Sequence, residues 1–461
     1  MQTVLPDNIF REYDIRGVWG KDLTEDVVFS IGRAFAYYLR EHLGKNENEK
    51  IRVTIGRDVR LSSPVMRDLL AGAFTKSGID VIDIGMCPTP LQYFSLFKLP
   101  VDGGVMITAS HNPAEFNGMK LSLRTETLYG DKIQEVKKLI EQSKFIDGAA
   151  AGSVSTYEII PDYIKYMREQ FGPLDGLNVV LDGGNGVAGL CAPEIVEGLG
   201  ANVTNLFMEP DGRFPNHHPD PVVVKNITAL IDTVRKKKAH LGVGYDGDAD
   251  RVGIVDEDGE MIWGDKMMII FARDLLKSHP GAMVIGEVKC SQTLYDDIAA
   301  HGGKPLMWKT GHSLIKSKMR ETGALISGEM SGHIFFADRY FGYDDAIYAS
   351  LRLMEIVKKN GPPYSVKKLL AGVPDMVATP EIRVDCPDEK KFGVVEKVKA
   401  ELAKEHPIIG IDGVRVQYPE GWGLVRASNT QPALVLRFEA KDEKSLEKIR
   451  ADVEGKLKRL M

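Results

Sequence analysis

The stretch Ile51-Arg-Val-Thr-Ile-Gly56 and, after a helical segment, Gly78-Ile-Asp-Val-Ile-Asp-Ile-Gly85 decide the fold class. Two β-rich runs separated by a helix and a glycine are typical of a βαβ unit in a mixed or parallel sheet. The same plan recurs at 177–206 and at 282–308. Because these units return about every 100 to 125 residues, the pattern predicts duplicated α/β domains and not a solenoid of short repeats.

The C-terminal part of the chain has a different pattern. Short strands are expected at 381–384, 413–417, 423–427 and 433–439, with helices at 390–405 and 443–460. The last helix places Leu446, Ile449, Val453, Leu457 and Leu460 on one apolar stripe. We therefore predict four domains, at 1–153, 154–257, 258–369 and 370–461. Three would be related α/β domains with mixed sheets, and the last a smaller α+β domain.

The composition is that of an ordinary globular protein, with 43% hydrophobic and 27% charged residues in a chain of 461. A formal net charge of −6 argues against a nucleic-acid partner, which favours a basic surface. We find no secretory signal and no apolar run long enough to span a bilayer. The cysteines, at 87, 191, 290 and 386, are scattered singly, as reduced structural thiols are. We expect a cytoplasmic protein with no membrane or nucleic-acid partner.

The first candidate site is Thr108-Ala-Ser-His-Asn-Pro113, which follows the apolar run Gly104-Val-Met-Ile107. Many α/β proteins bind ligands at the carboxyl ends of their strands, and Ser110 is expected at such a position. A turn stabilised by local hydrogen bonds of Ser and Asn-Pro is an equal alternative. The Gly-x-Ser-x-Gly motif of hydrolases is absent, which disfavours ordinary acyl transfer.

The second candidate is Asp246-Gly-Asp-Ala-Asp-Arg251, directly after Leu241-Gly-Val-Gly-Tyr245. Three carboxylates at alternate positions on a tight loop can converge on one hard cation, and oxygen-only ligands suit Mg²⁺. Without a cation their like charges would repel one another. An EF-hand is excluded, because Glu257 is reached only through the strand-like run 252–255. A solvated acidic turn is the remaining alternative.

Two further loops carry polar side chains suited to a sugar phosphate. Gly328-Glu-Met-Ser-Gly-His333 sets a carboxylate, a hydroxyl and an imidazole between glycines, although a glycine-rich turn explains it better when it is taken alone. Arg426-Ala-Ser-Asn-Thr-Gln-Pro432 combines a guanidinium fork with further donors, as in an anion cradle, with a turn between strands as the alternative. Gly183-Gly-Asn-Gly186 lacks the full dinucleotide spacing and indicates a tight strand–helix turn; no Walker A motif occurs.

Together with Phe10-Arg-Glu-Tyr-Asp-Ile-Arg-Gly17, these four motifs resemble the α-D-phosphohexomutase superfamily in their order and domain positions. Within it, the chain is similar to the bacterial phosphomannomutase/phosphoglucomutase family over essentially its whole length. In order along the chain, the four motifs resemble that family's phosphoserine, metal, sugar and phosphate loops. The resemblance implies three related α/β domains and a smaller fourth domain around a central cleft.

The resemblance also implies a reaction and its cofactors. Ser110 would carry a phosphoryl group, one oxygen of which binds a single Mg²⁺ together with Asp246, Asp248 and Asp250. The enzyme would move a phosphoryl group between O1 and O6 of mannose and glucose phosphates, through a 1,6-bisphosphate that turns end for end. Glucose 1,6-bisphosphate or an equivalent would be the activator. The chain would work as a monomer on small-molecule hexose phosphates.

Further residue roles follow from the same resemblance. Lys120, in Asn117-Gly-Met-Lys120, and His333 are expected to act as general acid and base, in an order left open, and Arg251 to contact the phosphoryl group. Glu329 and Ser331 would bind the sugar 3- and 4-hydroxyls. The other expected substrate contacts are Tyr13, Arg16, His111, Lys289, His312, Arg426, Ser428, Asn429 and Thr430. Met330 stands where phosphoglucosamine mutases usually have glutamine, which favours the mannose/glucose branch.

Two other functions remain open at this point. In a metal-dependent phosphatase, water would replace the sugar hydroxyl as the acceptor. In a sugar-phosphate-binding regulator, the site would bind without turnover. The presence of Ser110 together with all three aspartates argues against the regulator, because a sensor needs no acceptor serine beside a metal.

Overall fold

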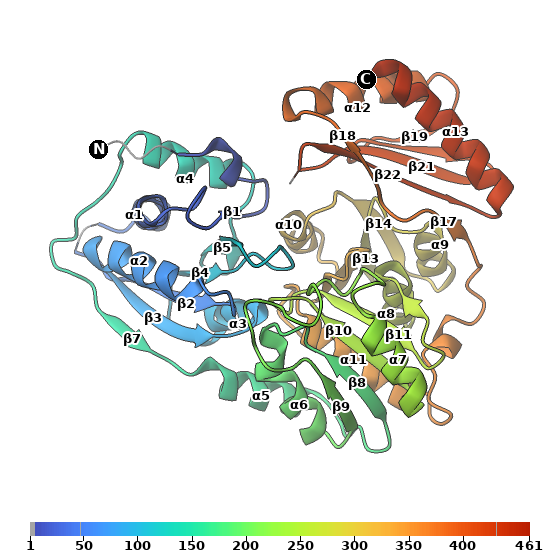
Figure 1. Ribbon diagram of the computed structural model, residues 1–461. Helices are drawn as coiled ribbons and strands as arrows, with labels where there is room; N and C mark the ends of the chain where they lie inside the picture. Colours follow the sequence, from blue (N-terminus) through green and yellow to red (C-terminus); the bar gives the residue numbers. More distant parts are fainter. Residues whose placement is uncertain (1–4, 47, 430) are drawn as a thin grey trace.

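The computed structural model describes residues 5–46, 48–429 and 431–461, except for the side chain of Asp7. These residues form four β-sheets, which the chain visits in order from the N-terminal to the C-terminal domain (Figure 1). Among the described residues, no helix is both long and apolar enough to cross a membrane.

The first sheet has the order β1-β5-β4-β2-β3-β7, with β6 (Glu126–Thr127) paired to β5. Its strands are β1 (Ile15–Val18), β2 (Ile51–Arg57), β3 (Ile79–Met86), β4 (Gly103–Ile107), β5 (Phe116–Leu123) and β7 (Val154–Thr156). β2 is parallel to β3 and β4, whereas β5 is antiparallel to β1 and β4, so the sheet is mixed. β7 pairs with β3, so the first sheet runs past the boundary expected at 153.

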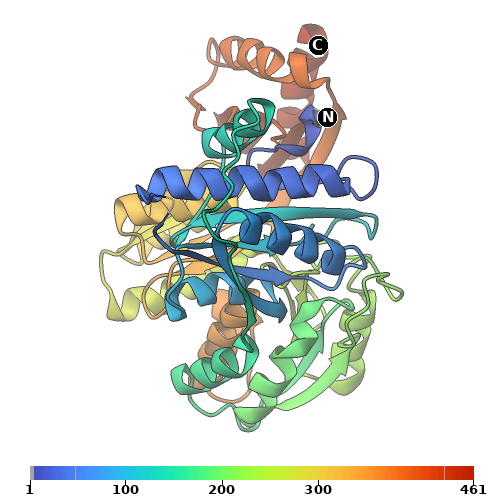
Figure 2. The same cartoon turned by 90° about the vertical axis from the view of Figure 1, so that its left-hand side faces the viewer.

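Four helices pack around this sheet: α1 (Glu25–Leu43), α2 (Ser63–Lys76), α3 (Thr89–Lys98) and α4 (Asp131–Glu141). α2 and α3 contact β2, and α1 packs on α2 and α4. Figure 2 shows α1, in dark blue, crossing the face of the first domain. The Thr24 hydroxyl begins α1 by accepting a hydrogen bond from the Val27 amide, and Gly44 ends it in a left-handed conformation.

The second sheet is β12-β11-β10-β8-β9 and the third is β14-β13-β15-β16. The second consists of β8 (Asn178–Asp182), β9 (Asn202–Leu206), β10 (Leu241–Tyr245), β11 (Val252–Asp256) and β12 (Met261–Ile262). The third consists of β13 (Met283–Glu287), β14 (Lys304–Trp308), β15 (Ile326–Gly328) and β16 (Ile334–Phe336). Because β12 pairs with β11, the second sheet runs past the boundary expected at 257.

The helices of these two domains join them through a common core. They are α5 (Ile159–Gln170), α6 (Ala192–Gly198), α7 (Thr228–Lys237), α8 (Gly264–Ser278), α9 (Gln292–Ala300), α10 (His312–Thr322) and α11 (Ala346–Lys359). The part of the chain that the structure describes also has three short 3₁₀ turns, at Asp7–Ile9, Val187–Leu190 and Lys367–Leu370. One apolar cluster contains residues of α5, α6, α8 and α11 and also Leu91 and Phe94 of α3. The first three domains therefore pack against one another through apolar side chains.

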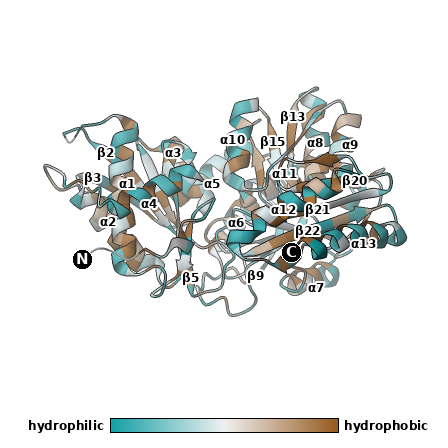
Figure 3. Cartoon of the chain, turned by 90° about the horizontal axis from the view of Figure 1, so that it is seen from above, coloured by the Kyte–Doolittle hydropathy of each residue, from teal (hydrophilic) through white to brown (hydrophobic). Residues whose placement is uncertain are grey.

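The fourth sheet is antiparallel and has its own core. Its order is β17-β22-β21-β20-β19, with β18 paired to β22. The strands are β17 (Val377–Ala378), β18 (Ile382–Asp385), β19 (Ile408–Ile409), β20 (Val414–Tyr418), β21 (Gly421–Ala427) and β22 (Ala433–Ala440), and the helices are α12 (Asp388–Leu402) and α13 (Glu443–Leu460). α13 has the predicted bounds, and four of its five stripe residues are buried in a separate cluster. Its outer face is mostly hydrophilic (Figure 3). The four sheets confirm the predicted fold class.

Candidate active site

Ser110 lies on the loop that follows β4, buried and within reach of the aspartate loop. Its Oγ is 2.7 Å from Oδ2 of Asp246 and 3.1 Å from Nδ1 of His111. The Ser110 backbone has φ 51, which L residues seldom adopt, and its amide donates to Oγ1 of Thr108 at 2.9 Å. Burial, with Arg251 and Arg16 nearby, holds the pKa of His111 well below its usual value. The loop is thus a constrained turn that aims a serine at three carboxylates.

Arg60 holds this loop in place, and the sequence patterns did not identify it. Its guanidinium donates to four carbonyl oxygens of the loop and its exit: Ser110 (2.8 Å), Asn112 (2.6 Å), Pro113 (2.6 Å) and Phe116 (2.9 Å). Its Nε donates to Asp58 at 3.0 Å, and the residue is 1% exposed. Because all three nitrogens are used, Arg60 fixes the loop backbone whatever the state of the serine side chain.

The aspartate loop joins β10 to β11, and its three carboxylates are fully buried. One ligand oxygen from each of Asp246, Asp248 and Asp250 lies within 4.8 Å of the others. Oδ1 of Asp248 and Oδ1 of Asp250 have no hydrogen-bond partner among the described residues. The loop packs tightly on the serine loop, since a Cβ at Gly247 would lie 2.6 Å from the Ser110 carbonyl oxygen. Unpartnered carboxylate oxygens at this spacing fit a hard divalent cation such as Mg²⁺.

Lys120 neutralises part of the loop's charge, and Thr89 donates a hydrogen bond to it. The Lys120 ammonium, on β5, contacts Oδ2 of Asp250 and lies 3.3 Å from Oδ2 of Asp248, to which the Thr89 hydroxyl donates at 2.6 Å. Burial alone would lower the pKa of Lys120, but the two aspartates raise it well above its usual value. Burial, together with the negative charges of Asp248 and Asp250, raises the pKa of Asp246. Lys120 is therefore protonated in this arrangement.

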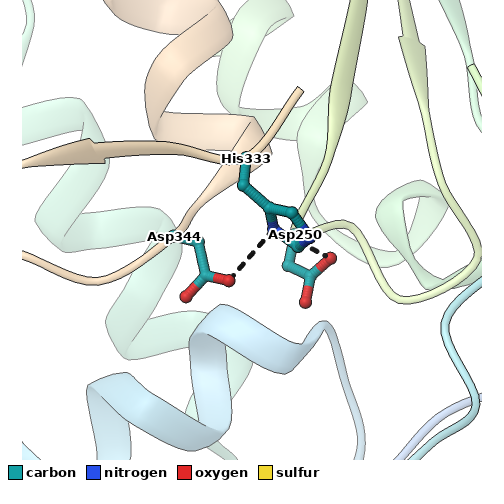
Figure 4. A group of neighbouring side chains, drawn as sticks. All are labelled: Asp250, His333 and Asp344. Atoms are coloured by element: carbon teal, nitrogen blue, oxygen red, sulfur yellow. Dashed lines mark ion pairs between the residues drawn. The ribbon is translucent and has the colours of Figure 1, made fainter. Parts of the chain in front are cut away.

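His333 lies beside the carboxylates of Asp250 and Asp344 (Figure 4). Its ring also contacts Arg251. Nε of Arg251 donates to Nε2 of His333 at 3.0 Å, while Nδ1 lies 3.1 Å from Asp344 and 3.6 Å from Asp250. Since a guanidinium can only donate, Nε2 is the acceptor and the ring proton faces the carboxylates on Nδ1. Asp344, absent from the sequence prediction, also accepts from Lys316 at 3.0 Å.

The predicted sugar loop is buried beside the start of α10. Oε1 of Glu329 accepts from the Gly311 amide at 2.6 Å, and burial, followed by the charge of Glu287, raises the pKa of Glu329. Ser331 is half-buried on the same loop. The His312 ring stacks on that of His333, with their centroids 5.4 Å apart. These four predicted residues therefore lie together.

The predicted phosphate cradle brings three domains together. Nε of Arg426 donates to Asp412 at 2.9 Å, whereas Nη2 of this buried side chain has no partner among the described residues. The Tyr13 hydroxyl accepts from Nδ2 of Asn429 at 2.7 Å and donates to the Thr310 carbonyl at 2.7 Å.

The remaining expected substrate contacts are Ser428, Thr430, Lys289 and Arg16. Ser428 is buried next to Asn429, and Thr430 lies outside the described residues. Nζ of Lys289 is 3.4 Å from Glu287 and 3.3 Å from Glu381. Arg16 donates to Oδ1 of Asn112 at 2.9 Å, which places it at the serine loop.

Four protein families match the chain, each described as a domain of phosphoglucomutase/phosphomannomutase. The α/β/α domains I, II and III match residues 7–147, 161–259 and 263–376, and the C-terminal domain matches 381–456. The chain is 45% identical to the phosphomannomutase/phosphoglucomutase of Pseudomonas aeruginosa over 98% of this chain and 96% of that one. It is 44% identical to a phosphoglucomutase of Neisseria gonorrhoeae, with 96% and 95% covered.

A solved structure has the same arrangement of domains. The phosphoglucomutase/phosphomannomutase family protein of Burkholderia thailandensis is 41% identical and superposes with a TM-score of 0.91 over 99% of this chain and 98% of that one. The chain therefore belongs to the phosphoglucomutase/phosphomannomutase family, isomerases that transfer a phosphoryl group within a hexose phosphate.

Proposed function

We propose that this chain interconverts the 1- and 6-phosphates of mannose and of glucose, with Ser110 as the carrier of the transferred phosphoryl group. One observation carries the proposal: Oγ of Ser110 is 2.7 Å from Asp246, beside two further buried carboxylate oxygens that accept no hydrogen bond from the described part of the chain. A serine beside three carboxylates is a poor anion site by itself, because like charges repel. A phosphoserine there requires a cation.

Asp246, Asp248 and Asp250, with a phosphoryl oxygen on Ser110, would hold one Mg²⁺. When bound, this ion neutralises the phosphoryl charge and stabilises it during transfer. Arg251, next to the loop, would contact the phosphoryl oxygens. If it does so, Nε2 of His333 loses its donor and becomes free to accept a proton. Lys120, whose ammonium lies beside Asp248 and Asp250, would donate one.

At the other end, Arg426, Ser428, Asn429 and Thr430 would bind the phosphate that is not being transferred. Glu329 and Ser331 would bind the sugar 3- and 4-hydroxyls, which mannose and glucose share. The bisphosphate intermediate turns end for end, so these groups bind the sugar in both orientations. Tyr13, Arg16, His111, Lys289 and His312 would complete the contacts.

We also propose that the chain acts as a cytoplasmic monomer, with glucose 1,6-bisphosphate as activator. All four cysteines are buried and unpaired, which suits a reducing compartment.

Intact-protein mass after incubation with glucose 1,6-bisphosphate and Mg²⁺ tests the carrier. The wild-type chain should gain one phosphate, and Ser110→Ala should gain none and lose mutase activity on mannose 1-phosphate. Ser122→Ala is the matched control, because Ser122 is a buried serine of the same domain whose hydroxyl has no hydrogen-bond partner within the described ranges. Phosphorylation of Ser110→Ala would refute the assignment, and stoichiometric release of inorganic phosphate would indicate a phosphatase.

A further inference from the structure

The loop that carries Lys289 is bound through its backbone by two arginines of the fourth domain. Nη1 of Arg415 donates to the carbonyl oxygens of Val288 and Cys290, both at 2.8 Å. Nη1 of Arg437 donates to the carbonyl oxygen of Lys289. Three successive backbone carbonyls therefore accept hydrogen bonds from the fourth domain. The Lys289 side chain takes no part in these three hydrogen bonds.

Both arginines are buried in a polar contact between domains. Arg415 is 0% and Arg437 6% exposed, and the Arg415 guanidinium lies 3.8 Å from the ring centroid of Trp422. Oε1 of Glu439 accepts from the Trp422 indole at 2.8 Å and from the Gln292 amide, at the start of α9, at 3.1 Å. Buried charges with several hydrogen bonds each are costly to displace, so the third and fourth domains are held firmly at this loop.

The strand register explains why these side chains face the third domain. Arg415 pairs with Leu424, and Leu424 pairs with Arg437, so the three lie in one row across β20, β21 and β22. Side chains directly opposite each other in a sheet share a face, as do residues two apart along a strand. Arg426 is two residues from Leu424 and therefore shares this face.

The opposite face of the same sheet packs on α12 and α13. Val414, Val425, Leu436 and Phe438, which alternate with the arginines, belong to the apolar core of the fourth domain. One face of the sheet thus forms this core, and the other carries the cradle arginine together with the two arginines that bind the Lys289 loop.

Arg437 also reaches the sugar loop. Its Nη1 contacts Sδ of Met330, and its Nη2 lies 3.7 Å from Oδ2 of Asp265. Asp265 in turn accepts from the Ser291 amide at 2.9 Å. One side chain of the fourth domain therefore touches both the Lys289 loop and the loop that carries Glu329 and Ser331.

We propose that Arg437, with Arg415, is a positioning residue that fixes Lys289 to the sheet bearing Arg426. Lys289 of the third domain and Arg426 of the fourth domain are then held at a fixed separation. Both side chains bind the phosphate that is not being transferred. This inference rests on the proposed role of Lys289 and Arg426 in binding that phosphate. Arg437 itself acts through Lys289 and not on the substrate.

A double-mutant cycle with Arg437→Met and Lys289→Met tests this, with KM and kcat for mannose 1-phosphate as the readouts. We expect Arg437→Met to raise KM about tenfold with a smaller change in kcat, as loss of buried charged hydrogen bonds would do. In the double variant, KM should be no higher than in Lys289→Met alone, because the arginine acts through the lysine. Arg450→Met, at an exposed arginine of α13 paired with Glu454, is the control and should leave both constants unchanged.

Independent, multiplying effects of the two substitutions on KM would overturn the proposal, as would an unchanged KM in Arg437→Met. An unchanged KM in Lys289→Met would instead refute the proposed substrate contact. If Arg437→Met loses its native near-ultraviolet circular dichroism, the cycle is run with Arg437→Lys, which keeps the charge without the guanidinium fork. The same non-additivity is then expected, with a smaller rise in KM.

Discussion

The site has a serine end, around Ser110, and a cradle end, around Arg426. Both contain buried polar atoms without a hydrogen-bond partner among the described residues, but these atoms carry opposite charges. At the serine end, two buried carboxylate oxygens, of Asp248 and Asp250, have no hydrogen-bond partner among the described residues. At the cradle end, the unpartnered buried atom is a guanidinium nitrogen, Nη2 of Arg426. The first end is therefore suited to a cation and the second to an anion, which are the two charges that a metal-dependent enzyme acting on phosphates requires.

The two ends also differ in how they are built. The serine end consists of two closely packed loops; Arg60 binds the backbone of the serine loop, and Lys120 neutralises part of the charge of the aspartate loop. The cradle end is assembled from the first, third and fourth domains through Tyr13, Thr310 and Asn429. We infer that substitutions at the serine end affect the chemical step and the stability, whereas those at the cradle end affect mainly substrate affinity.

The largest effect is expected for Lys120→Met. Removing this ammonium leaves buried aspartates without their cation, which typically costs about 3–5 kcal/mol of unfolding free energy. Loss of the proton donor should lower kcat about 10²–10⁴-fold.

Thermal unfolding of the Lys120→Met variant should show a larger stabilisation by Mg²⁺ than that of the wild type. Lys132→Met, at a half-exposed lysine of the same domain, is the control; equal Mg²⁺ effects in both chains would contradict the view that Lys120 neutralises the loop.

The next effect is expected for Arg60→Lys, which tests whether the serine loop needs its guanidinium. A lysine cannot reach four carbonyls, so buried acceptors are left unpaired, at a cost of about 3 kcal/mol. Displacement of the serine by an ångström could lower kcat by about 10²-fold. Urea unfolding and kcat measure the two effects. Arg67→Lys, at a less buried arginine of α2, should change neither, and a wild-type kcat in Arg60→Lys would show that the loop holds its own shape.

A pH-dependent effect is expected at the cradle end for Glu381→Gln. Lys289 lowers the pKa of Glu381 to about 2, against the effect of burial. A lowered carboxyl pKa stabilises the folded state above the unfolded value of about 4.5, and this contribution, about 2 kcal/mol, is lost as pH falls towards 2. Wild type should therefore be more stable than the variant at pH 6, by a difference that shrinks at pH 3.5. A constant difference in urea unfolding would rule out this ionic contribution.

The smallest effect is expected for Tyr13→Phe, which removes the hydroxyl that joins Thr310 to Asn429. Loss of these hydrogen bonds costs about 1 kcal/mol, so KM should rise about fivefold with kcat nearly unchanged. Steady-state kinetics with mannose 1-phosphate measure this. Tyr157→Phe, at an exposed tyrosine bonded to Asp162, is the control. A fall in kcat with constant KM would mean that the cradle end influences the chemical step.

The chain's local patterns determined the repeated α/β units, the α+β character of the last domain, the bounds of α13 and the residue types of the site loops. These features depend on periodicity and on turn chemistry within a few residues, which a sequence shows directly. The tertiary structure alone identified Arg60, Asp344, Arg415 and Arg437. None of them belongs to the motifs found in the sequence, and Arg60, Arg415 and Arg437 act on backbone carbonyls at least 50 positions away. Every residue has a backbone carbonyl, so the sequence does not mark which carbonyls an arginine binds. Only the tertiary structure shows which carbonyl lies next to which guanidinium.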